Sequence, residues 1–396
     1  MLTILTELLM KTNRYDVYLI NEQNTELDYK YHKKVKREIQ KKEEQTIRDF
    51  DEAHDIQIYV MNNDVSNLLD IYHSLGKKVI GIFHGVYLSC VFTHDPLIYR
   101  SWYFFGKFDS FIHIIPDDYW VYKKFGFNNS IYVPNLYTFD HTKTPSSQLT
   151  YKNVLMVGRV DDVIKGGRYG ILAMGEILKE IPDATLTIVA PNHSKDLIDL
   201  IKDLKIEKNV RLIGFTRNIS EFYLNATVLL VTSISESFPM VMNEAKAHGL
   251  PIVSFDIDYS PCFQSGVITV DMYNYTLMAK EAIKLLNNYE YRKRKAKEAK
   301  LSLEMYNNNN TIILWEKLIN SLINGTEEYK KLQKEVENKY YNETLAKAHL
   351  EKHYKLAQQI NEKFRCHTFD NFTTLSYINV ANNCPIENKT NNSKTS

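Results

Sequence analysis

The chain has 396 residues, a formal net charge of +1 and ordinary fractions of apolar and charged side chains. This length exceeds one ordinary hydrophobic core and indicates two domains, while the balanced charge gives no electrostatic basis for nucleic-acid binding. The four cysteines are scattered without a C-x-x-C pair, so neither a zinc site nor a disulfide framework is expected. The absence of a signal peptide and of any apolar run of transmembrane length predicts a cytoplasmic protein.

The first third of the chain alternates strand-like and helix-like segments. The expected strands are Asp16–Ile20, Ile56–Val60, Lys78–Phe83, Ser110–Ile115 and Ser130–Val133. A helix is expected over Leu2–Lys11, and helical patterns lie between the strands, notably in the charged stretch Tyr29–Asp55. Such alternation is typical of a parallel sheet covered by helices. We therefore expect a first α/β domain over residues 1–134.

His84 follows the apolar strand-like run that ends at Phe83. Two interpretations of this histidine stand: a half-buried side chain that is hydrogen-bonded for structural reasons, or a residue of an active site. Gly85 favours the second interpretation, because a glycine lets a ligand approach the backbone closely.

The polar stretch 135–152 predicts a linker between two domains. Beyond it, strands are expected at Ala184–Ala190, Val210–Ile213, Val228–Val231, Ile252–Phe255 and Val267–Val270, and helices at Tyr169–Glu180, Leu277–Leu286 and Glu290–Glu304. These elements predict a second α/β domain over residues 153–310. An amphipathic helix that closes this domain is expected over 311–325, and a charged helix over 326–365. The charged helix is either exposed to solvent or paired with a partner, and we prefer the first interpretation. The Asn-, Thr- and Ser-rich residues 366–396 are expected to be disordered.

The segment Asn153–Gly167 predicts a strand followed by a loop that contains Arg159 and Lys165. Parallel α/β sheets bind ligands at the carboxyl ends of their strands, where this loop is expected to lie. An arginine fork and a mobile lysine charge together suit a diphosphate. Either cation alone would more often be a solvated loop residue, so the interpretation depends on a second polar segment further along the chain.

That second segment contains Glu236 and Glu244, eight residues apart, between two predicted strands. Pro239 suits the first turn of a helix, and Gly249 supplies its C-terminal stop. A helix that starts after the carboxyl end of a parallel strand presents unpaired N–H groups to an anion such as phosphate. Carboxylates accept hydrogen bonds from hydroxyl groups, so the segment predicts a site for a polyhydroxyl ligand that carries phosphate.

The ordered set Gly-Arg…Lys-Gly, Glu-x7-Glu and Gly-x-Pro-Ile-Val resembles the donor-binding half of the retaining glycosyltransferases of family four, within the glycosyl transferases group 1. The resemblance runs from about Asn153 to Leu286. It implies the GT-B fold, an α/β architecture of two Rossmann-like domains whose parallel sheets face each other across a cleft, here with a C-terminal helical extension. It also implies transfer of a sugar from a nucleotide-diphosphate sugar to an acceptor hydroxyl of a glycan, lipid or protein, with retention of anomeric configuration.

The resemblance assigns roles to individual residues. Arg159 and Lys165 would hold the diphosphate and stabilise the leaving group, and Glu236 would face the donor sugar. Glu244 would accept hydrogen bonds from the ribose hydroxyls. His84 occupies the place of the family's active-site histidine and is counted as catalytic with Arg159, Lys165 and Glu236. Further donor-binding contacts are expected from Gly158 and Ser237 and from the backbone N–H groups of Phe238, Met240 and Val241, near the phosphates or the sugar.

The expected partners follow from this assignment. The donor is a nucleotide-diphosphate sugar, and the acceptor is a glycan or a lipid-linked molecule. A lipid-linked acceptor would bring the protein to a membrane surface as a peripheral contact. No obligatory cofactor or metal is expected: the D-x-D matches Asp49–Asp51 and Asp256–Asp258 carry little weight, and Arg159 and Lys165 already supply positive charge. No nucleic acid partner is expected, and the sequence predicts no particular oligomeric state.

Members of this family begin with a strand and a Gly-rich loop before the first helix, and both are missing ahead of Leu2. We therefore expect either that the true start lies upstream or that part of the active site has been lost. Two alternatives to a transferase remain: a catalytically silent GT-B protein that binds nucleotide sugars, or a sugar-nucleotide epimerase that needs no acceptor. Turnover of bound donor separates an enzyme from a binding protein.

Overall fold

The computed structural model describes residues 2–21, 36–39, 43–62, 66–82, 84, 104–124, 126–160, 164–234, 236, 238–257, 265–305, 308–344, 347–348, 351 and 355. The chain forms two compact units, which we call the N-terminal and the C-terminal domain. The N-terminal domain joins residues 42–133 to 317–396, and the C-terminal domain joins residues 1–41 to 134–316. The expected first domain of residues 1–134 is thus divided between the two units.

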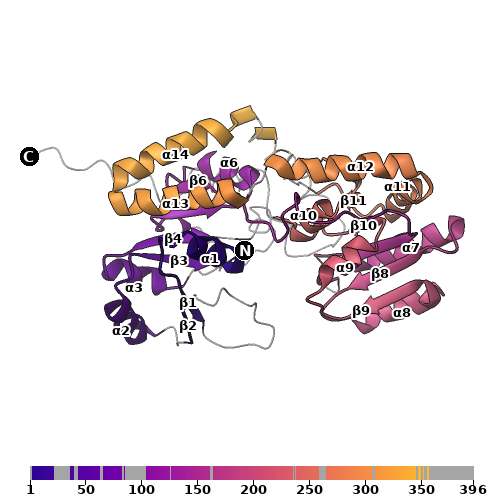
Figure 1. Cartoon of the computed structure of the whole chain (residues 1–396), viewed down its shortest axis with the longest axis horizontal. Helices are drawn as coiled ribbons and strands as arrows, with labels where there is room; N and C mark the ends of the chain where they lie inside the picture. Colours follow the sequence, from indigo (N-terminus) through magenta and orange to yellow (C-terminus); the bar gives the residue numbers. More distant parts are fainter. Residues whose placement is uncertain are drawn as a thin grey trace, which may run out of the picture. The chain divides into compact units, whose positions relative to one another are not determined.

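The N-terminal domain contains a four-stranded parallel sheet in the order β3-β4-β5-β6 (Figure 1). Its strands are β3 (Ile58–Asn62), β4 (Lys78–Ile82), β5 (Ser110–His113) and β6 (Ser130–Tyr132), and its first helices are α2 (Glu44–His54), α3 (Leu68–Ser74) and α6 (Pro116–Lys124). Every residue of β5 and β6 is buried, as expected for parallel strands covered on both faces. All four strands were expected from the sequence, within a few residues of their observed bounds.

The first helix and the first strand form where the sequence predicts them, but that strand does not join the N-terminal sheet. Helix α1 spans Leu2–Lys11, and β1 (Tyr18–Asn21) pairs in parallel with β2 (Lys36–Ile39) as a separate two-stranded sheet. The predicted helicity of Tyr29–Asp55 is therefore wrong at β2 and confirmed in α2, while residues 29–35 and 40–42 lie outside the described residues. The charged residues of β2 favour a helix by well under 1 kcal/mol each, a preference that pairing with a neighbouring strand overrides.

Aromatic rings surround His113 in the core of the N-terminal domain. The rings of Phe111 and Tyr122 both lie 4.7 Å from its imidazole, and that of Tyr119 lies 6.1 Å away. The His113 side chain is 3% exposed, and its Nε2 is 3.0 Å from Ser130 Oγ. Burial lowers the pKa of His113 to about 3, because the charged imidazolium would lose its hydration.

The burial of neutral His113 predicts a stability that depends on pH. An unfolded histidine titrates near pH 6.5, so the unfolded chain binds a proton that the folded domain does not accept until about pH 3. This contribution to stability is complete above pH 6.5 and is lost progressively as the pH falls from 6.5 towards 3. Between about pH 6 and about pH 4, the urea-derived free energy of unfolding should fall about 1.4 kcal/mol per pH unit more steeply in the wild type than in His113→Gln. Equal slopes in the two proteins would contradict this assignment.

The C-terminal domain contains a six-stranded parallel sheet in the order β12-β11-β10-β7-β8-β9. The strands are β7 (Asn153–Val157), β8 (Thr185–Val189), β9 (Val210–Ile213), β10 (Val228–Val231), β11 (Ile252–Phe255) and β12 (Val267–Val270). The helices are α7 (Gly167–Glu180), α8 (Lys195–Asp203), α9 (Ile219–Leu224), α10 (Met240–Ala247), α11 (Tyr275–Asn287) and α12 (Tyr289–Leu301), with short 3₁₀ helices at Glu207–Asn209 and Ser302–Met305. The strands and helices expected between residues 153 and 305 are confirmed.

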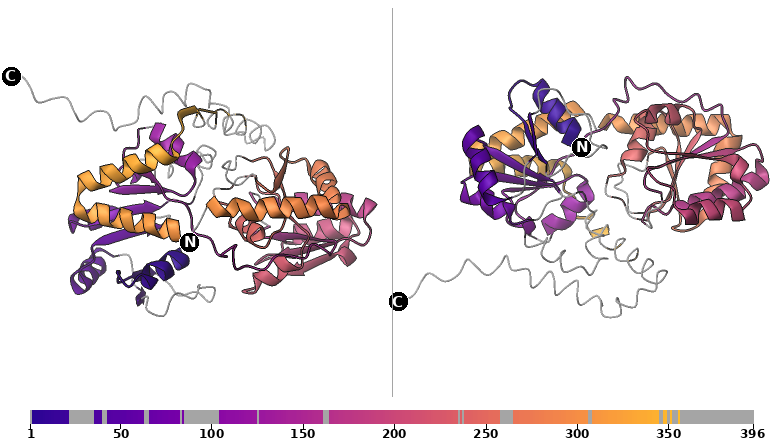
Figure 2. Two further views of the ribbon diagram at one scale, coloured as in Figure 1. Left: turned by 45° about the horizontal axis from the view of Figure 1, so that its top comes forward. Right: turned by 90° about the horizontal axis from the view of Figure 1, so that it is seen from below.

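The order of these strands decides which helices share a face of the sheet. The chain runs from β7 to β9 in one direction and then returns past β7 to β12 on the other side. Right-handed crossovers therefore place α7 and α8 on one face and α9 and α10 on the other (Figure 2). Helix α11 packs against α7 and so covers the same face as α7 and α8.

Helix α13 (Asn308–Asn324) contributes to both units, since residues 308–316 group with the C-terminal domain and the rest with the N-terminal domain. Helix α14 (Thr326–Tyr340) follows it and lies at its side (Figures 1 and 2). Lys317 of α13 and Glu335 of α14 form an ion pair, with Nζ 2.7 Å from Oε1.

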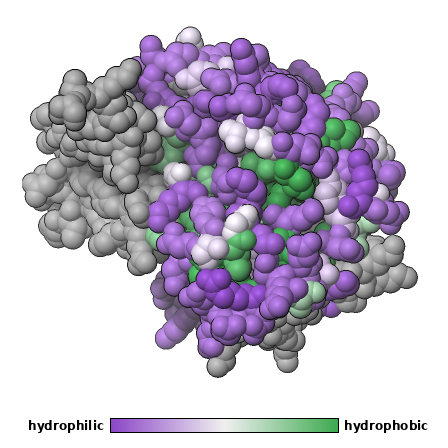
Figure 3. All heavy atoms as spheres, turned by 90° about the vertical axis from the view of Figure 1, so that its left-hand side faces the viewer, coloured by the Kyte–Doolittle hydropathy of each residue, from purple (hydrophilic) through white to green (hydrophobic). Residues whose placement is uncertain are grey.

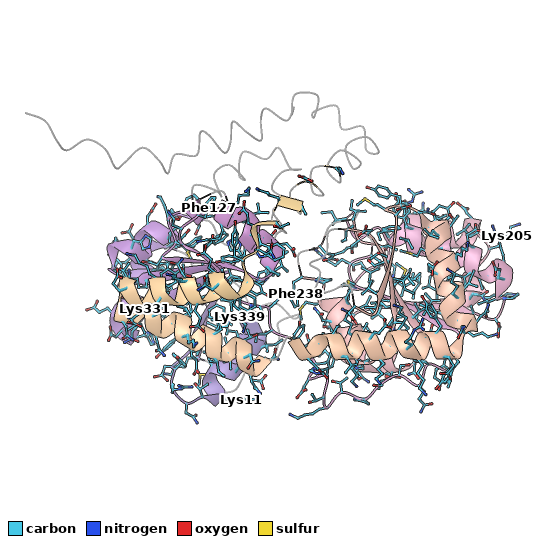
Figure 4. The ribbon with its side chains drawn as sticks, turned by 90° about the horizontal axis from the view of Figure 1, so that it is seen from above. Lys11, Phe127, Lys205, Phe238, Lys331 and Lys339 are labelled. Carbon is cyan, nitrogen blue, oxygen red and sulfur yellow. The ribbon has the colours of Figure 1, made fainter. Side chains whose placement is uncertain are left out.

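Helix α14 is not the solvated helix that its charged sequence suggested. Tyr329, Leu332 and Val336 are buried on one side of it, while Lys331 and Lys339 (labelled in Figure 4) are exposed. Three apolar side chains at helical spacing thus pack α14 against the N-terminal domain. The sequence did not reveal this narrow apolar face, because charged residues make up most of the helix.

The surface of the protein mixes hydrophilic and apolar side chains. On the face shown in Figure 3, hydrophilic residues predominate and a smaller group of apolar side chains lies among them. Such a mixture is normal, because more than half of the accessible surface of a folded protein is contributed by apolar atoms. Across the part of the chain that the structure describes, no helix is both long and apolar enough to cross a bilayer.

Candidate functional site

The two polar segments singled out in the sequence meet because β7 and β10 are neighbouring parallel strands. Gly158 and Arg159 come directly after β7, and the segment with Glu236 comes after β10. Both segments therefore lie at the carboxyl edge of the sheet, the edge at which open α/β sheets bind ligands. This topology brings Lys165 and Glu236 together although they are 71 residues apart in the sequence.

A small pocket of about 50 Å³ lies between the ends of β7 and β10. Four of its lining residues were expected from the sequence to bind donor or to be catalytic: Gly158, Lys165, Glu236 and Val241. Its other lining residues include Met156, Val157, Leu230, Val231, Thr232 and Ser233. A few polar groups thus converge on apolar strand residues, which is the usual composition of a small-molecule site.

Lys165 and Glu236 form an ion pair at this pocket, with Nζ 2.6 Å from Oε1. Ser233 Oγ donates a hydrogen bond to the same Oε1 at 2.8 Å. The Glu236 side chain is 11% exposed and that of Lys165 is 27% exposed. Because water screens this pair much less than a surface pair, each group holds the other firmly in place. Sequence reasoning found Lys165 and Glu236 but missed Ser233, whose only signal was its position three residues before Glu236.

Further hydrogen bonds join the loop after β7 to the loop after β10. Thr232 Oγ1 donates to the Lys165 carbonyl at 2.8 Å, and Ile234 N donates to the Ile164 carbonyl at 2.8 Å. Gly166 has a φ of +60°, and a Cβ at this position would lie 2.5 Å from the Thr232 carbonyl oxygen. The close approach of the two loops therefore requires glycine at position 166.

Helix α10 starts at Met240, directly after Pro239. The backbone N–H groups of Met242 and Asn243 donate to the Pro239 carbonyl at 3.0 and 3.3 Å. By helix geometry, the N–H groups of Met240 and Val241 precede these bonds and point out of the first turn. Together with the positive end of the helix dipole, this arrangement suits an anion such as phosphate.

The other residues expected to bind the donor lie in different environments. Phe238 (labelled in Figure 4) is buried, and its ring lies 5.7 Å from that of Tyr137, so its side chain belongs to the core. Arg159 is exposed at the end of β7, next to Gly158 with its φ of +122°. Ser237 lies outside the described residues.

Glu244 accepts hydrogen bonds at both of its carboxylate oxygens. Tyr223 Oη donates to Oε2 at 2.9 Å, and Thr138 Oγ1 donates to Oε1 at 3.2 Å. Burial raises the pKa of Glu244, and these two hydrogen bonds act in the opposite direction. Sequence reasoning found Glu244 but missed Tyr223 and Thr138, which are 21 and 106 residues away in the sequence and belong to no motif.

His84 lies at the carboxyl end of β4 in the N-terminal domain. Its Nε2 is 2.8 Å from Oδ1 of Asn62, the last residue of the neighbouring strand β3. Burial lowers the pKa of His84 to about 4, so the ring is neutral near pH 7. With the Asn62 amide oxygen as acceptor, Nε2 carries the proton of the neutral ring. Gly85, which favoured a functional role for His84, lies outside the described residues.

In the described parts of the chain, no three His, Cys, Asp or Glu side chains are grouped closely enough to hold a metal ion. Asp258 and the four cysteines, Cys90, Cys262, Cys366 and Cys384, lie outside those parts, as does the tail over residues 366–396.

The segment that holds this site is similar to a known protein family. Residues 140–302 match the model of the glycosyl transferases group 1. An uncharacterized glycosyltransferase from Haemophilus influenzae is 30% identical over 204 residues, which cover 50% of this chain and 57% of that protein. The chain spans between 26% and 58% of the length of the first curated relatives it matches.

Two solved structures show the same fold at low sequence identity. Sucrose-phosphate synthase from Thermosynechococcus elongatus has a TM-score of 0.69 and 14% identity, over 81% of this chain and 92% of that one. A variant of S. aureus TarM in complex with Fondaparinux, alpha-GlcNAc-glycerol and UDP has a TM-score of 0.57 and 20% identity, over 66% of this chain and 55% of that one.

The two parallel α/β domains therefore have the GT-B fold, as the sequence predicted. Arg159, Lys165, Glu236 and Glu244 all lie within residues 140–302, the segment that matches the model of the glycosyl transferases group 1. The narrower assignment to the retaining enzymes of family four remains a prediction.

Proposed function

We propose that this chain transfers a sugar from a nucleotide-diphosphate sugar to an acceptor hydroxyl with retention of anomeric configuration. One observation carries the proposal: the Lys165–Glu236 ion pair and the start of α10 lie at one pocket, at the ends of the adjacent strands β7 and β10. Positive charge, helix N–H groups and hydroxyl acceptors converge there, which is the combination that a sugar attached to a diphosphate requires.

The donor is proposed to bind along this edge of the C-terminal domain. Arg159 and Lys165 hold the diphosphate together with the N–H groups of Met240 and Val241, and Glu244 accepts hydrogen bonds from the ribose. The UDP bound in the TarM structure makes UDP-sugars the first donors to test.

The chemistry is proposed to begin with cleavage of the anomeric C–O bond, with oxocarbenium character in the transition state. Charge that develops on the departing diphosphate is neutralised by Arg159, Lys165 and the N-terminus of α10, a preorganised electrostatic stabilisation. Glu236, anchored by Lys165 and Ser233, faces the donor sugar. The acceptor hydroxyl attacks from the face that the diphosphate leaves, and a phosphate oxygen takes its proton, so the configuration is retained.

The N-terminal domain is proposed to contribute His84 to the active site and to bind the acceptor. His84, which is neutral near pH 7 and lies at the carboxyl end of β4, suits a hydrogen bond to a hydroxyl of the donor sugar. The acceptor itself is a glycan or a lipid-linked molecule, and a lipid-linked acceptor would place this enzyme at a membrane surface.

The proposal is tested by calorimetric binding of UDP-, GDP-, ADP- and TDP-sugars to the wild type and to Arg159→Ala and Glu244→Ala. We expect one nucleotide class to bind and each substitution to weaken binding by about tenfold or more, because a hydrogen bond to a charged group contributes about 1.5–3 kcal/mol. The matched controls are Arg211→Ala and Glu180→Ala, which remove exposed charges of the same kind elsewhere in this domain. They should bind like the wild type.

Turnover then separates the candidate functions. A transferase consumes donor only when an acceptor is present, and the anomeric coupling constant of its product in NMR reports retention. Release of an isomerised sugar without an acceptor would identify an epimerase, and binding without turnover would identify a silent binding protein. Failure of every nucleotide sugar to bind would refute the proposal itself.

A further inference from the structure

The Glu244 carboxylate is held from two sides by residues of very different exposure. Tyr223, which donates to Oε2 at 2.9 Å, is completely buried in α9. Thr138, which donates to Oε1 at 3.2 Å, is exposed and lies near the start of residues 134–316 of the C-terminal domain. One oxygen of Glu244 is therefore fixed in the core, while the other faces the accessible side of the protein.

The buried side of this arrangement is rigid. The ring of Tyr223 stacks on that of His248 with a centroid separation of 5.1 Å. His248 lies within hydrogen-bonding distance of the Glu244 carbonyl, 2.7 Å from Nδ1, and of Ser220 Oγ, 2.7 Å from Nε2. Because the carbonyl accepts from Nδ1–H, the neutral ring accepts from Ser220 at Nε2. These contacts hold Tyr223, and through it the carboxylate, in one orientation.

The exposed side is also fixed, because the backbone on both sides of Thr138 is anchored. Tyr137 N donates to Asn308 Oδ1 at 2.8 Å, and Asn308 Nδ2 donates back to the Tyr137 carbonyl at 3.0 Å. On the other side, the ring of Phe139 packs edge-on against His248 at 4.7 Å. Thr138 Oγ1 is thus an accessible hydroxyl in a defined position beside Glu244.

We propose that Thr138 and Tyr223 are specificity-determining residues that present Glu244 to the two hydroxyls of a ribose and so select ribonucleotide donors over 2′-deoxyribonucleotide donors. The inference rests on the proposed function and deepens it, since it names the residues that position Glu244 and the discrimination that they produce. Tyr223 acts through Glu244 and is a positioning residue. Thr138 likewise acts through Glu244, because its proton is donated to Oε1 and both ribose hydroxyls donate to the carboxylate.

The capacity of the carboxylate supports this selection. A carboxylate offers about four lone-pair directions, and Tyr223 and Thr138 occupy one on each oxygen. The remaining directions match the two hydroxyls of a ribose. A deoxyribose leaves one of them without a partner in a partly dehydrated site, where an unmade hydrogen bond is costly. The raised pKa of Glu244, caused by its burial, agrees with such dehydration.

The test measures dissociation constants by calorimetry for UDP, GDP and ADP, each beside its 2′-deoxy counterpart. The wild type should bind its preferred ribonucleotide about tenfold more tightly than the deoxy form. Thr138→Val, which is isosteric but lacks the hydroxyl, should weaken ribonucleotide binding and leave deoxyribonucleotide binding nearly unchanged. The ratio of the deoxyribonucleotide dissociation constant to that of the ribonucleotide should therefore fall towards one. Tyr223→Phe should lower the same ratio, with circular dichroism confirming that the fold is intact.

The control is Thr276→Val, which makes the same change at an exposed threonine whose hydroxyl donates to Asn274 at the start of α11. Its ratio should equal that of the wild type. Equal binding of the two forms by the wild type, or an unchanged ratio in Thr138→Val, would overturn the inference while leaving the proposed function intact. If the wild type binds none of the six nucleotides and no nucleotide sugar, the proposed function fails and the inference with it. If it binds a TDP-sugar alone, the proposed function stands and only the inference is overturned.

Discussion

Replacing Lys165 with methionine is expected to lower kcat for sugar transfer by about 10²–10³-fold, the loss that follows removal of one preorganised group from a developing anion. Lys165 Nζ is held 2.6 Å from Glu236 at the pocket, so its charge is in place before the diphosphate departs. Methionine keeps the length of the side chain and removes only the charge and the donors. Steady-state kinetics with the donor identified by calorimetry measures the effect.

The matched control for Lys165→Met is Lys179→Met, which removes an exposed lysine of α7 that pairs with Glu176. This variant should retain full activity. A double-mutant cycle with Glu236→Gln tests whether the two groups act as a unit, because residues in one ion pair give strongly non-additive effects. Full activity of Lys165→Met, or strict additivity in the cycle, would contradict the assigned role.

Removing residues 326–396 is expected to leave the N-terminal domain barely stable or unfolded. Helix α14 buries Tyr329, Leu332 and Val336, and each fully buried side chain of this size contributes about 1.5–3 kcal/mol. The summed stabilisation lost with these three side chains is comparable with the whole free energy of unfolding of a typical domain, about 5–15 kcal/mol. Thermal unfolding followed by circular dichroism measures the change.

The control is a variant that lacks only residues 356–396 and retains α14, and it should unfold near the wild-type temperature. A finer variant, Tyr329→Phe, removes a hydroxyl that lies 2.8 Å from Ser110 Oγ and 2.9 Å from the Asn129 carbonyl. It should cost about 1 kcal/mol, the typical net contribution of a hydrogen bond. If the chain without residues 326–396 unfolds at the wild-type temperature, α14 is a dispensable appendage.

Local patterns in the sequence were sufficient to predict the strands between residues 153 and 270 and several of the helices beside them. Short apolar runs such as Val228–Val231 are strands because β-branched side chains fit a buried parallel sheet, and this preference needs no knowledge of distant partners. The helix after Glu236 could likewise be placed, since Pro239 and Gly249 mark its ends. Where a local preference was weak, as in the charged residues of β2, the prediction failed.

The candidate site was predicted only in part, because the sequence shows residue types and spacing but not partners. Arg159, Lys165, Glu236 and Glu244 stood out as charged groups at the expected ends of strands. Their chemistry could be inferred from the anion and hydroxyl ligands that such groups bind. Their actual contacts could not be inferred.

By itself, therefore, the sequence determined which segments are strands and helices, and that cations and carboxylates gather at the carboxyl ends of strands in an α/β protein. Only the tertiary structure decided that β7 lies beside β10, that Glu236 pairs with Lys165, and that Tyr223 and Thr138 hold Glu244. The physical reason is that periodicity, caps and turns act between residues close in the chain. Strand order and side-chain contacts are instead set by the packing of the whole core, which joins residues as far apart as Thr138 and Glu244.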